Sequence, residues 1–185
     1  MFSVVIPLYN KELSIKNTIQ SVLNQTFQDF EIVVVNDGST DNSLHVLKEI
    51  DDTRIRIINK TNGGVSSARN RGIKEAKYEW IAFLDGDDLW MENHLEILKN
   101  MIEAHPTDKV FTTSFVFSDN KFVSEKGNSF SCTRVENFCK ASLSHFNKTL
   151  MWTSVVCVHK KVFDNVVAFN TNYIRGEDVD LWIRI

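Results

Sequence analysis

The chain has 185 residues and a formal net charge of −3; 43% of its residues are hydrophobic and 24% are charged. This length and composition are typical of one globular domain with a sizeable core. The slightly negative charge argues against a nucleic-acid partner, because such proteins carry a basic face. No basic run marks a membrane-surface patch either.

The cysteines and histidines argue against a disulfide-bonded protein and against a zinc protein. The three cysteines lack CxxC spacing, and no basic leader precedes the short apolar run at the start of the sequence. We therefore expect reduced thiols and a cytoplasmic chain. The five histidines show no HExxH pattern, so no zinc site is expected.

The first half of the sequence alternates between strand and helix patterns. Strands are expected at residues 3–8, 30–36, 54–59 and 80–84, and helices at residues 11–25, 42–50, 65–76 and 92–104. Asn10 is the expected N-cap of the first helix. Strands that alternate with helices predict βαβ units and a mostly parallel sheet.

The most informative feature is the apolar run 80–84, which ends in three carboxylates, Asp85, Asp87 and Asp88, around Gly86. Because they follow a buried strand, these carboxylates should emerge together at the edge of the sheet. Like charges this close raise the free energy of the fold unless a cation lies among them. Carboxylate oxygens suit Mg²⁺ or Mn²⁺, which commonly also hold substrate phosphates. The run therefore predicts a metal-assisted site for a phosphorylated substrate.

Polar residues also follow the other expected strands. Tyr9 and Asn10 follow the first strand, Asp37 follows the second and Asn62 follows the third, just as Asp85 follows the fourth. Parallel sheets bind ligands in the crevice beyond the carboxyl ends of their strands. We therefore expect these residues, which are far apart in the sequence, to meet at one edge of the sheet.

From about residue 110 the pattern is less regular. The expected elements are a hairpin of strands 109–117 and 121–123 around a turn at 118–120, a helix at 136–144 and a strand at 153–159. Residues 175–185 have a helical pattern that stops without a cap and with an apolar last residue. This ending predicts a fragment of a longer protein; the alternative is a natural terminus that packs on the core.

Five motifs, taken in order, give the sequence a family resemblance. They are Val4-Val5-Ile6-Pro7-Leu8-Tyr9-Asn10, Asn36-Asp37-Gly38-Ser39-Thr40-Asp41, Asn62-Gly63-Gly64 with Ser67-Ala68-Arg69-Asn70-Arg71-Gly72, Asp85-Gly86-Asp87-Asp88, and Glu177-Asp178. With these motifs the sequence resembles a family 2 glycosyltransferase of the GT-A fold over nearly the whole chain. The resemblance implies an α/β fold with a Rossmann-like, mostly parallel central sheet flanked by helices. It implies one catalytic domain at 1–185, with a nucleotide-binding half at 1–105 and a less regular acceptor-side half at 106–185 that is truncated at its C-terminus.

The same resemblance implies transfer of a hexose or N-acetylhexosamine from a nucleotide diphosphate, expected to be UDP, to an acceptor hydroxyl with inversion. Pro7 and Tyr9 would line the base pocket, and Asp37 would accept a hydrogen bond from the base. Asp37 could instead be only a turn-former in Asp-Gly-Ser. Arg69 would approach the base or diphosphate, with an exposed helix arginine as the alternative. Asp85 would face the ribose, or it would hold the groups that bind the metal ion without binding the ion itself.

The metal and catalytic roles are also implied by the resemblance. Asp87 would bind Mn²⁺ or Mg²⁺ directly, and Asp88 would be a second ligand or would brace the turn. Asp178 would be the general base, because an acceptor hydroxyl is a poor nucleophile until its proton is removed. Glu177 would support Asp178 or touch the acceptor.

The expected partners are a nucleotide-sugar donor and a glycan or lipid-linked saccharide acceptor, as in polysaccharide or lipid-linked glycan synthesis. Segments absent from the sequence leave room for peripheral attachment at the inner face of the cell membrane. One alternative is a catalytically inactive nucleotide-binding module of the same fold. A metal-dependent phosphotransferase is another alternative, although the sequence has no GxxxxGK[ST] motif. A nicotinamide-dependent dehydrogenase is disfavoured, because no GxGxxG motif follows the first strand.

Overall fold

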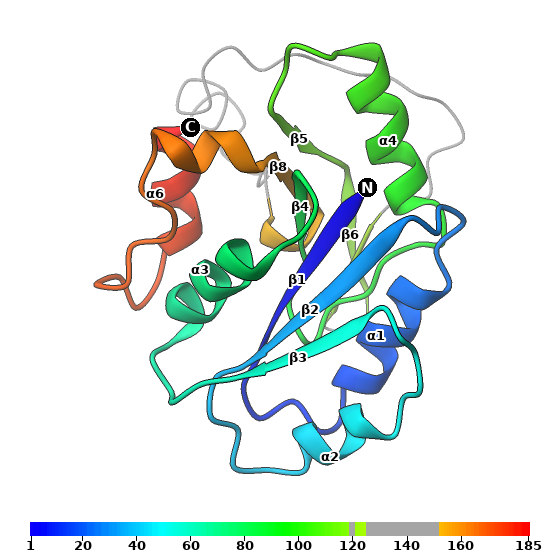
Figure 1. The fold of residues 1–185 in the computed structure, drawn as a ribbon, viewed down its shortest axis with the longest axis vertical. Helices are drawn as coiled ribbons and strands as arrows, with labels where there is room; N and C mark the ends of the chain where they lie inside the picture. The colour runs from blue at the N-terminus through cyan, green and yellow to red at the C-terminus, as the bar shows by residue number, and fades with distance from the viewer. Residues whose placement is uncertain (119–120, 125–151) are drawn as a thin grey trace.

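The computed structural model describes residues 1–118, 121–124 and 152–185. Its centre is a six-stranded sheet with the strand order β3-β2-β1-β4-β8-β5 (Figure 1). The strands are β1 (Phe2–Leu8), β2 (Phe30–Asn36), β3 (Ile55–Asn59), β4 (Trp80–Phe83), β5 (Val110–Thr112) and β8 (Val156–His159). β1 to β4 run parallel, while β8 runs antiparallel to both β4 and β5. The predicted α/β fold with a mostly parallel sheet is confirmed.

Helices cover both faces of this sheet (Figure 1). One face carries α1 (Ile15–Leu23), α2 (Ser43–Lys48) and α4 (His94–Ala104), and the other carries α3 (Val65–Glu75) and α6 (Glu177–Arg184). Side chains alternate along each strand, so Val4 packs toward the first group of helices and Val5 toward the second. Because both faces are covered, β1 and β2 are buried along almost their whole length, as near-continuous Val and Ile runs require.

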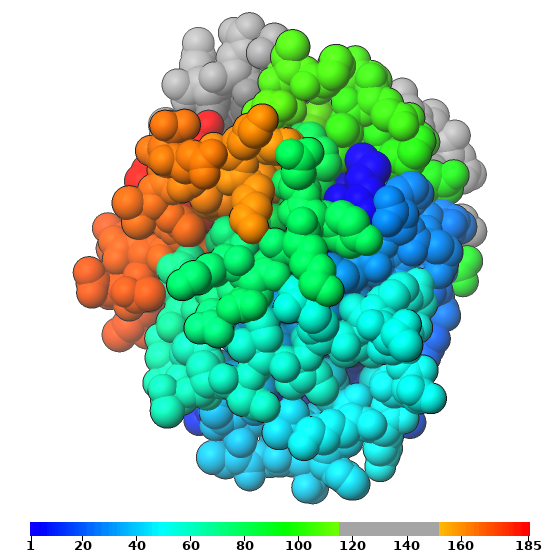
Figure 2. Space-filling model, in the orientation of Figure 1, coloured from blue at the N-terminus to red at the C-terminus, as the bar shows by residue number. Residues whose placement is uncertain are grey.

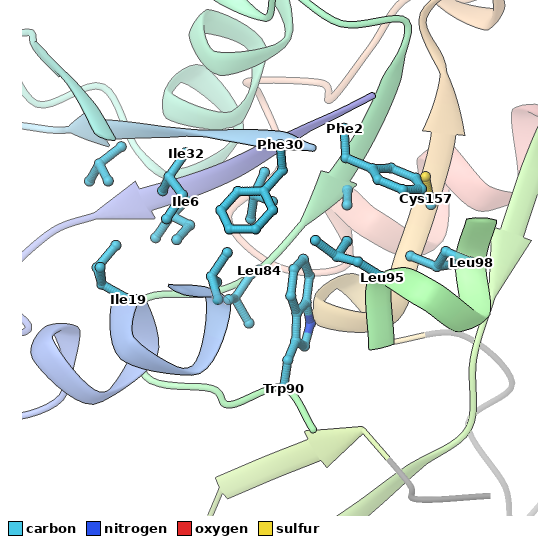
Figure 3. Close-up of a cluster of buried hydrophobic side chains, with 14 of the residues drawn as sticks. Phe2, Ile6, Ile19, Phe30, Ile32, Leu84, Trp90, Leu95, Leu98 and Cys157 are labelled. Atoms are coloured by element: carbon cyan, nitrogen blue, oxygen red, sulfur yellow. The ribbon is translucent and has the colours of Figure 1, made fainter. Parts of the chain in front are cut away.

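Two apolar cores fill the space between sheet and helices. In the larger one, Ile6 and Phe30 of the sheet meet Ile19 of α1 and Leu95 of α4 (Figure 3). The smaller core joins α3 to the C-terminal helix, with Trp182 packed on the opposite face of the sheet. Figure 2 accordingly shows the C-terminal segment, in orange and red, lying against the green and cyan surface around α3.

The helix predicted at 11–25 begins later, at Ile15. Asn10 does not cap it, and that prediction is wrong. Asn10 has a positive φ of 50°, and its side-chain oxygen accepts a hydrogen bond from the backbone N–H of Thr40 at 2.8 Å. Ser14 is the residue before the helix, and its side chain makes no capping hydrogen bond. Lys11 therefore lies in the loop between β1 and α1.

The second half differs more from its prediction. β5 joins the main sheet by pairing with β8, so the hairpin forms from β6 (Phe115–Ser118) and β7 (Lys121–Ser124), and a single strand over 109–117 is wrong. The strand predicted at 153–159 begins with a 3₁₀ turn (Thr153–Val155) before β8. The helical pattern near the C-terminus is confirmed as α6, and the helix predicted at 136–144 lies outside the described residues. None of the helices in the described ranges is long and apolar enough to cross a membrane.

Gly72 marks a close approach of α3 to the sheet. A Cβ atom at this position would lie 2.2 Å from Cγ1 of Val5, closer than real contacts allow. We expect Gly72→Ala to lower the free energy of unfolding by about 1–3 kcal/mol, because α3 must shift away from β1. Urea unfolding measures this change, and Lys74→Ala on the exposed side of α3 is the control, with an expected change within about 0.5 kcal/mol. Equal free energies of unfolding for Gly72→Ala and the wild type would show that the space between α3 and β1 can hold a methyl group at this position.

His94, the first residue of α4, is a buried and neutral imidazole. Its ring stacks on Trp90 with the ring centroids 4.3 Å apart, and its Nδ1 lies 3.3 Å from Oγ1 of Thr113. Burial lowers the pKa of His94 from 6.5 to about 3. In the pH range between these values the unfolded chain binds a proton that the folded chain does not. Stability is therefore complete above the unfolded pKa and decreases as the pH falls toward the folded one.

We expect the free energy of unfolding to fall as the pH is lowered from about 6 to about 4.5, a range in which most carboxylates stay ionised. The contribution of His94 approaches about 1.4 kcal/mol per pH unit. Denaturant unfolding at several pH values measures the slope for the wild type and for His94→Gln. The variant should show a flatter slope by that amount, and equal slopes would contradict a neutral buried His94.

Candidate active site

A cleft of about 500 Å³ lies beyond the carboxyl ends of β1, β2 and β4. Its lining includes every residue predicted for the donor nucleotide, namely Pro7, Tyr9, Asp37, Arg69 and Asp85, together with Asp87. Asp88, Glu177 and Asp178 lie outside this lining. The sheet therefore brings together side chains from four separate parts of the first half of the chain, as the strand-end argument predicted.

An apolar wall of the cleft comes from the end of β1 and the start of α3. Pro7 and Tyr9 contribute from the first element, and Val65 and Ala68 from the second. Tyr9 has 47% of its surface exposed, although it follows a strand that is buried along almost its whole length. An aromatic ring and small apolar side chains at an open cleft suit the flat face of a ligand such as a nucleotide base.

Asp37 is buried at the end of β2, and its carboxylate is heavily hydrogen-bonded. The backbone N–H groups of Gly63 and Gly64 donate to it at 3.0 and 2.8 Å, and the ammonium of Lys60 forms an ion pair with it. Gly64 itself has a φ of 85°, a conformation that favours glycine, at the residue before α3. Asp37 thus orders the turn that leads into α3, a role that its own Asp-Gly-Ser sequence did not reveal.

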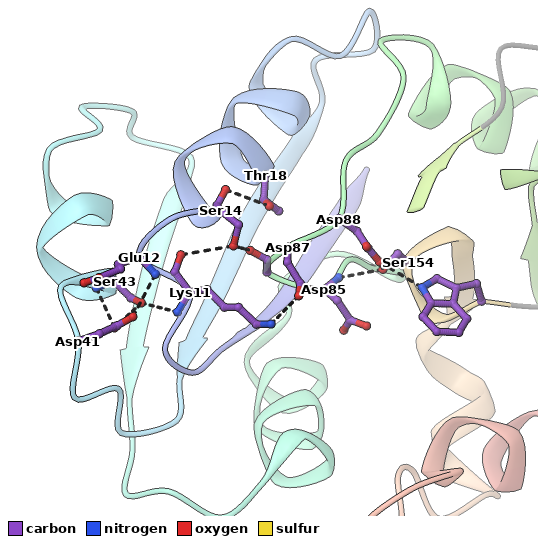
Figure 4. Close-up of polar contacts among 12 residues, drawn as sticks. Lys11, Glu12, Ser14, Thr18, Asp41, Ser43, Asp85, Asp87, Asp88 and Ser154 are labelled. Carbon is purple, nitrogen blue, oxygen red and sulfur yellow. Dashed lines mark hydrogen bonds and ion pairs between the residues drawn. The ribbon is translucent and has the colours of Figure 1, made fainter. Parts of the chain in front are cut away.

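The three carboxylates of the acidic turn have different partners, and Figure 4 shows those of Asp87 and Asp88. Asp85 accepts a hydrogen bond from Arg69 at 2.7 Å, and Asp87 forms an ion pair with the ammonium of Lys11 at 2.5 Å. The Asp87 side chain is 47% exposed, against 23% for that of Asp85. Asp85 and Asp87 are therefore each paired with a cation, which offsets much of the repulsion that the sequence implied.

Asp88 turns away from the cleft toward the second half of the chain. Only 5% of the residue is exposed, and its Oδ2 accepts hydrogen bonds from Oγ of Ser154 at 2.5 Å and Nε1 of Trp152 at 3.1 Å. Ser154 also accepts the Nε1–H of Trp90 on its carbonyl oxygen, at 2.5 Å. These contacts correspond to the alternative in which Asp88 braces the turn.

Arg69 is a buried guanidinium that connects two parts of the chain. Its side chain is 4% exposed, and besides Asp85 it contacts Oε1 of Glu177 at 2.9 Å. Its Cζ also lies 5.1 Å from the ring centroid of Phe169. Burial by itself lowers the pKa of Arg69, but the two carboxylates outweigh burial and raise that pKa above its ordinary value. Arg69 therefore stays charged and ties the acidic turn to the start of α6; it is not an exposed helix arginine.

Asp178 lies in the first turn of α6, next to the residue that Arg69 holds. Its Oδ2 accepts a hydrogen bond from Oγ1 of Thr153 at 3.2 Å. Asp180 instead forms an ion pair with Arg184 at 2.8 Å, so the two neighbouring acids of this helix have different surroundings. Asp178 is partly exposed and has oxygen lone pairs left to accept a proton.

The donor atoms around Asp87 fit a dication that takes most of its ligands from elsewhere. No three His, Cys, Asp or Glu side chains come together as a complete metal site within the described ranges. Mg²⁺ and similar ions commonly bind through one or two carboxylates and complete their shell with water and substrate phosphates. The exposed carboxylate of Asp87, beside Asp85 in an open cleft, matches that mode of binding.

Sequence reasoning missed several residues of the site. Lys11 was assigned to a helix, yet it lines the cleft and pairs with Asp87. Lys60 and Ser154 hold Asp37 and Asp88, and nothing in the local sequence marks them. The only available signal for Lys11 was its position directly after the first strand and Asn10, where a loop can bring a side chain to the sheet edge.

Comparison with known proteins gives consistent matches. The family model described as glycosyl transferase family 2 matches residues 3–163. An uncharacterised glycosyltransferase of Rickettsia bellii is 34% identical over 186 residues, which cover 99% of this chain and 26% of that protein. WfgD of Escherichia coli, described as a UDP-Glc:alpha-D-GlcNAc-diphosphoundecaprenol beta-1,3-glucosyltransferase, is 30% identical over 188 residues, or 100% of this chain and 69% of WfgD.

A solved structure is similar as well. Residues 1–349 of S. aureus TarS, in complex with UDP, match with a TM-score of 0.71 and 25% sequence identity. The match covers 96% of this chain and 52% of the TarS chain. The chain thus spans about half of this TarS chain and only a quarter of the Rickettsia protein.

Proposed function

The chain belongs to glycosyl transferase family 2, and from this premise we propose that it moves a sugar from a nucleotide-diphosphate donor to an acceptor hydroxyl. The observation that carries the proposal is the cleft, which collects Tyr9, Asp37, Asp85 and Asp87 at one edge of the sheet. The donor is a UDP-sugar that carries a hexose or N-acetylhexosamine. The UDP named for TarS and the UDP-Glc named for WfgD support that choice.

The base of the donor lies between the apolar side chains at the end of β1 and the start of α3. Pro7 and Tyr9 line this slot, and Asp37 accepts a hydrogen bond from the base. Because Asp37 already holds two backbone N–H groups, its position is fixed before the donor arrives. Arg69 acts on the donor site chiefly by holding Asp85, which faces the ribose side of the nucleotide.

The metal ion of the reaction is Mn²⁺ or Mg²⁺, with Asp87 as its direct protein ligand. Such an ion offsets the negative charge that grows on the diphosphate as the glycosidic bond breaks. Asp88, predicted as a second ligand or a brace, is proposed here as the brace, since Ser154 and Trp152 hold its carboxylate. This bracing fixes the turn on which Asp87 stands.

Asp178 is the general base of the proposed mechanism. It takes the proton from the acceptor hydroxyl as the oxygen attacks the anomeric carbon, on the side opposite the departing diphosphate. Attack from that side inverts the configuration of the carbon. Glu177 supports this base by anchoring the start of α6 to Arg69.

The two halves of the chain divide these tasks. Residues 1–105 bind the nucleotide, and residues 106–185 form the acceptor side of the same catalytic domain. The acceptor is a glycan or lipid-linked saccharide in polysaccharide or lipid-linked glycan synthesis, as the name of WfgD suggests. A lipid-linked acceptor would place the reaction at the inner face of the cell membrane. Membership of the family does not favour a phosphotransferase.

Calorimetric titration of UDP in the presence of Mn²⁺, and again with a chelator, tests the proposal. UDP that binds only with the metal ion supports the donor site and justifies assays with UDP-sugars. Preference for another nucleoside diphosphate would keep the enzyme class and change the donor. A folded protein that binds no nucleoside diphosphate, or that binds UDP-sugars without turnover, would favour the inactive module.

A further inference from the structure

Among the described residues that line the cleft, only Lys11 has a charged side chain that the proposed mechanism does not use. Its ammonium lies 2.5 Å from Oδ2 of Asp87, the carboxylate oxygen that a metal ion would share. Both side chains are partly exposed, Lys11 by 38% and Asp87 by 47%. The ion pair of Arg69 with Asp85 differs from it, because the Arg69 side chain is only 4% exposed. The guanidinium of Arg69 is thus enclosed by the protein, whereas the ammonium of Lys11 is open to solvent.

The backbone near Lys11 is held by hydrogen bonds, whereas its partly exposed side chain is held by the ion pair with Asp87. The N–H of Lys11 donates to Oγ of Ser43 at 2.7 Å, and Oγ of Ser14 donates to the carbonyl oxygen of Gly86 at 2.9 Å (Figure 4). The loop after β1 is therefore tied directly to the acidic turn. The stem of Lys11 runs beside Gly86, where a Cβ atom would lie 3.5 Å from Cγ of Lys11. Its long side chain can thus reach different points of the cleft from one anchored position.

We propose that Lys11 is an exchangeable counter-ion, which neutralises Asp87 when no metal ion is bound and turns to the donor's diphosphate when a metal ion binds Asp87. This inference rests on the proposed function and adds a diphosphate-binding residue to it. Two cations compete for the same carboxylate oxygen, so metal binding releases the ammonium.

The charges of the site balance in both states. Without metal or donor, the ammonium of Lys11 cancels the charge of Asp87. With both bound, a dication matches the two phosphates of the donor, one charge on each, and Lys11 still balances Asp87 within the same cleft. An ammonium is also a suitable point charge for phosphate oxygens. The exchange therefore leaves no unpaired charge in either of these two states.

Removing the ammonium of Lys11 should strengthen the binding of a metal ion and weaken the binding of a diphosphate. In Lys11→Met, Mn²⁺ measured alone by electron paramagnetic resonance should bind about fivefold more tightly, since a partly exposed ion pair no longer competes. With saturating Mn²⁺, UDP should bind about tenfold more weakly, because a charge-assisted hydrogen bond to phosphate is lost. Uridine, which has no phosphate, should bind as it does to the wild type.

Two further variants make this test specific. Lys16→Met removes the same charge from an exposed position on α1 and should change neither constant. Lys11→Arg keeps the charge and should restore most of the UDP affinity. Unchanged or weaker Mn²⁺ binding in Lys11→Met would overturn the exchange, and so would equal losses of UDP and uridine affinity. A wild-type protein that needs no metal for UDP would overturn the proposed function as well, whereas failure in Lys11→Met alone overturns only this inference.

Discussion

Asp178→Asn is expected to slow sugar transfer by about 10²–10⁴-fold while UDP affinity stays within about twofold of the wild type. Asparagine has nearly the same shape and can still accept the hydrogen bond from Oγ1 of Thr153. It cannot take a proton from the acceptor hydroxyl, so only the chemical step suffers. UDP binding is preserved because Asp178 lies outside the lining of the donor cleft.

Single-turnover transfer from a UDP-sugar, with UDP affinity measured separately by calorimetry, separates these two effects. Asp180→Asn is the matched control, since it makes the same change in the same helix turn but at a residue that pairs with Arg184. The control should transfer sugar at close to the wild-type rate. Wild-type transfer by Asp178→Asn would exclude Asp178 as the base, and a parallel loss of UDP affinity would indicate a structural role instead.

Asp87→Ala is expected to weaken Mn²⁺-dependent UDP binding by at least about 100-fold and to abolish measurable transfer. The change removes the exposed carboxylate of the cleft, so a metal ion loses its direct protein ligand. The diphosphate would then meet Asp85 with no dication to offset the two negative charges. Because the Asp87 side chain is 47% exposed, its removal should leave the fold intact.

Calorimetry with UDP, with and without Mn²⁺, measures the loss, and circular dichroism confirms the fold of the variant. Asp51→Ala, in the exposed loop after α2, removes the same charge at a distance from the turn and should bind UDP normally. Metal-dependent UDP binding that survives in Asp87→Ala would remove Asp87 from the metal site. Asp85, the other carboxylate of the acidic turn that lines the cleft, would then be the candidate metal ligand.

The local pattern of the sequence was enough to predict the parallel strands of the sheet. The run Phe30–Asn36 is a strand over its whole predicted length, and Phe2–Leu8 differs from its prediction by one residue at its start. Buried parallel strands are near-continuous apolar runs, so their burial is visible in the sequence without any knowledge of their neighbours. The edge at which the cleft forms followed in the same way, because it depends only on strand direction.

Local pattern failed where distant residues compete for a polar group. Asn10 is a favourable N-cap in isolation, but Thr40 engages its side chain and the helix begins only at Ile15. The division of labour within the acidic turn was equally hidden, because Asp88 turns inward to Ser154 while Asp87 stays in the cleft.

The sequence by itself thus determined which polar residues follow which strand, and hence that these residues meet at one edge of the sheet. Only the tertiary structure decided which carboxylate each cation holds. Lys11 reaches Asp87, and Arg69 binds both Asp85 and Glu177, the second of which lies 108 residues away in the sequence. Ion pairs depend on distances of a few ångströms between side chains far apart in the chain. Those distances are set by how the two halves pack, and no periodicity within either half encodes them.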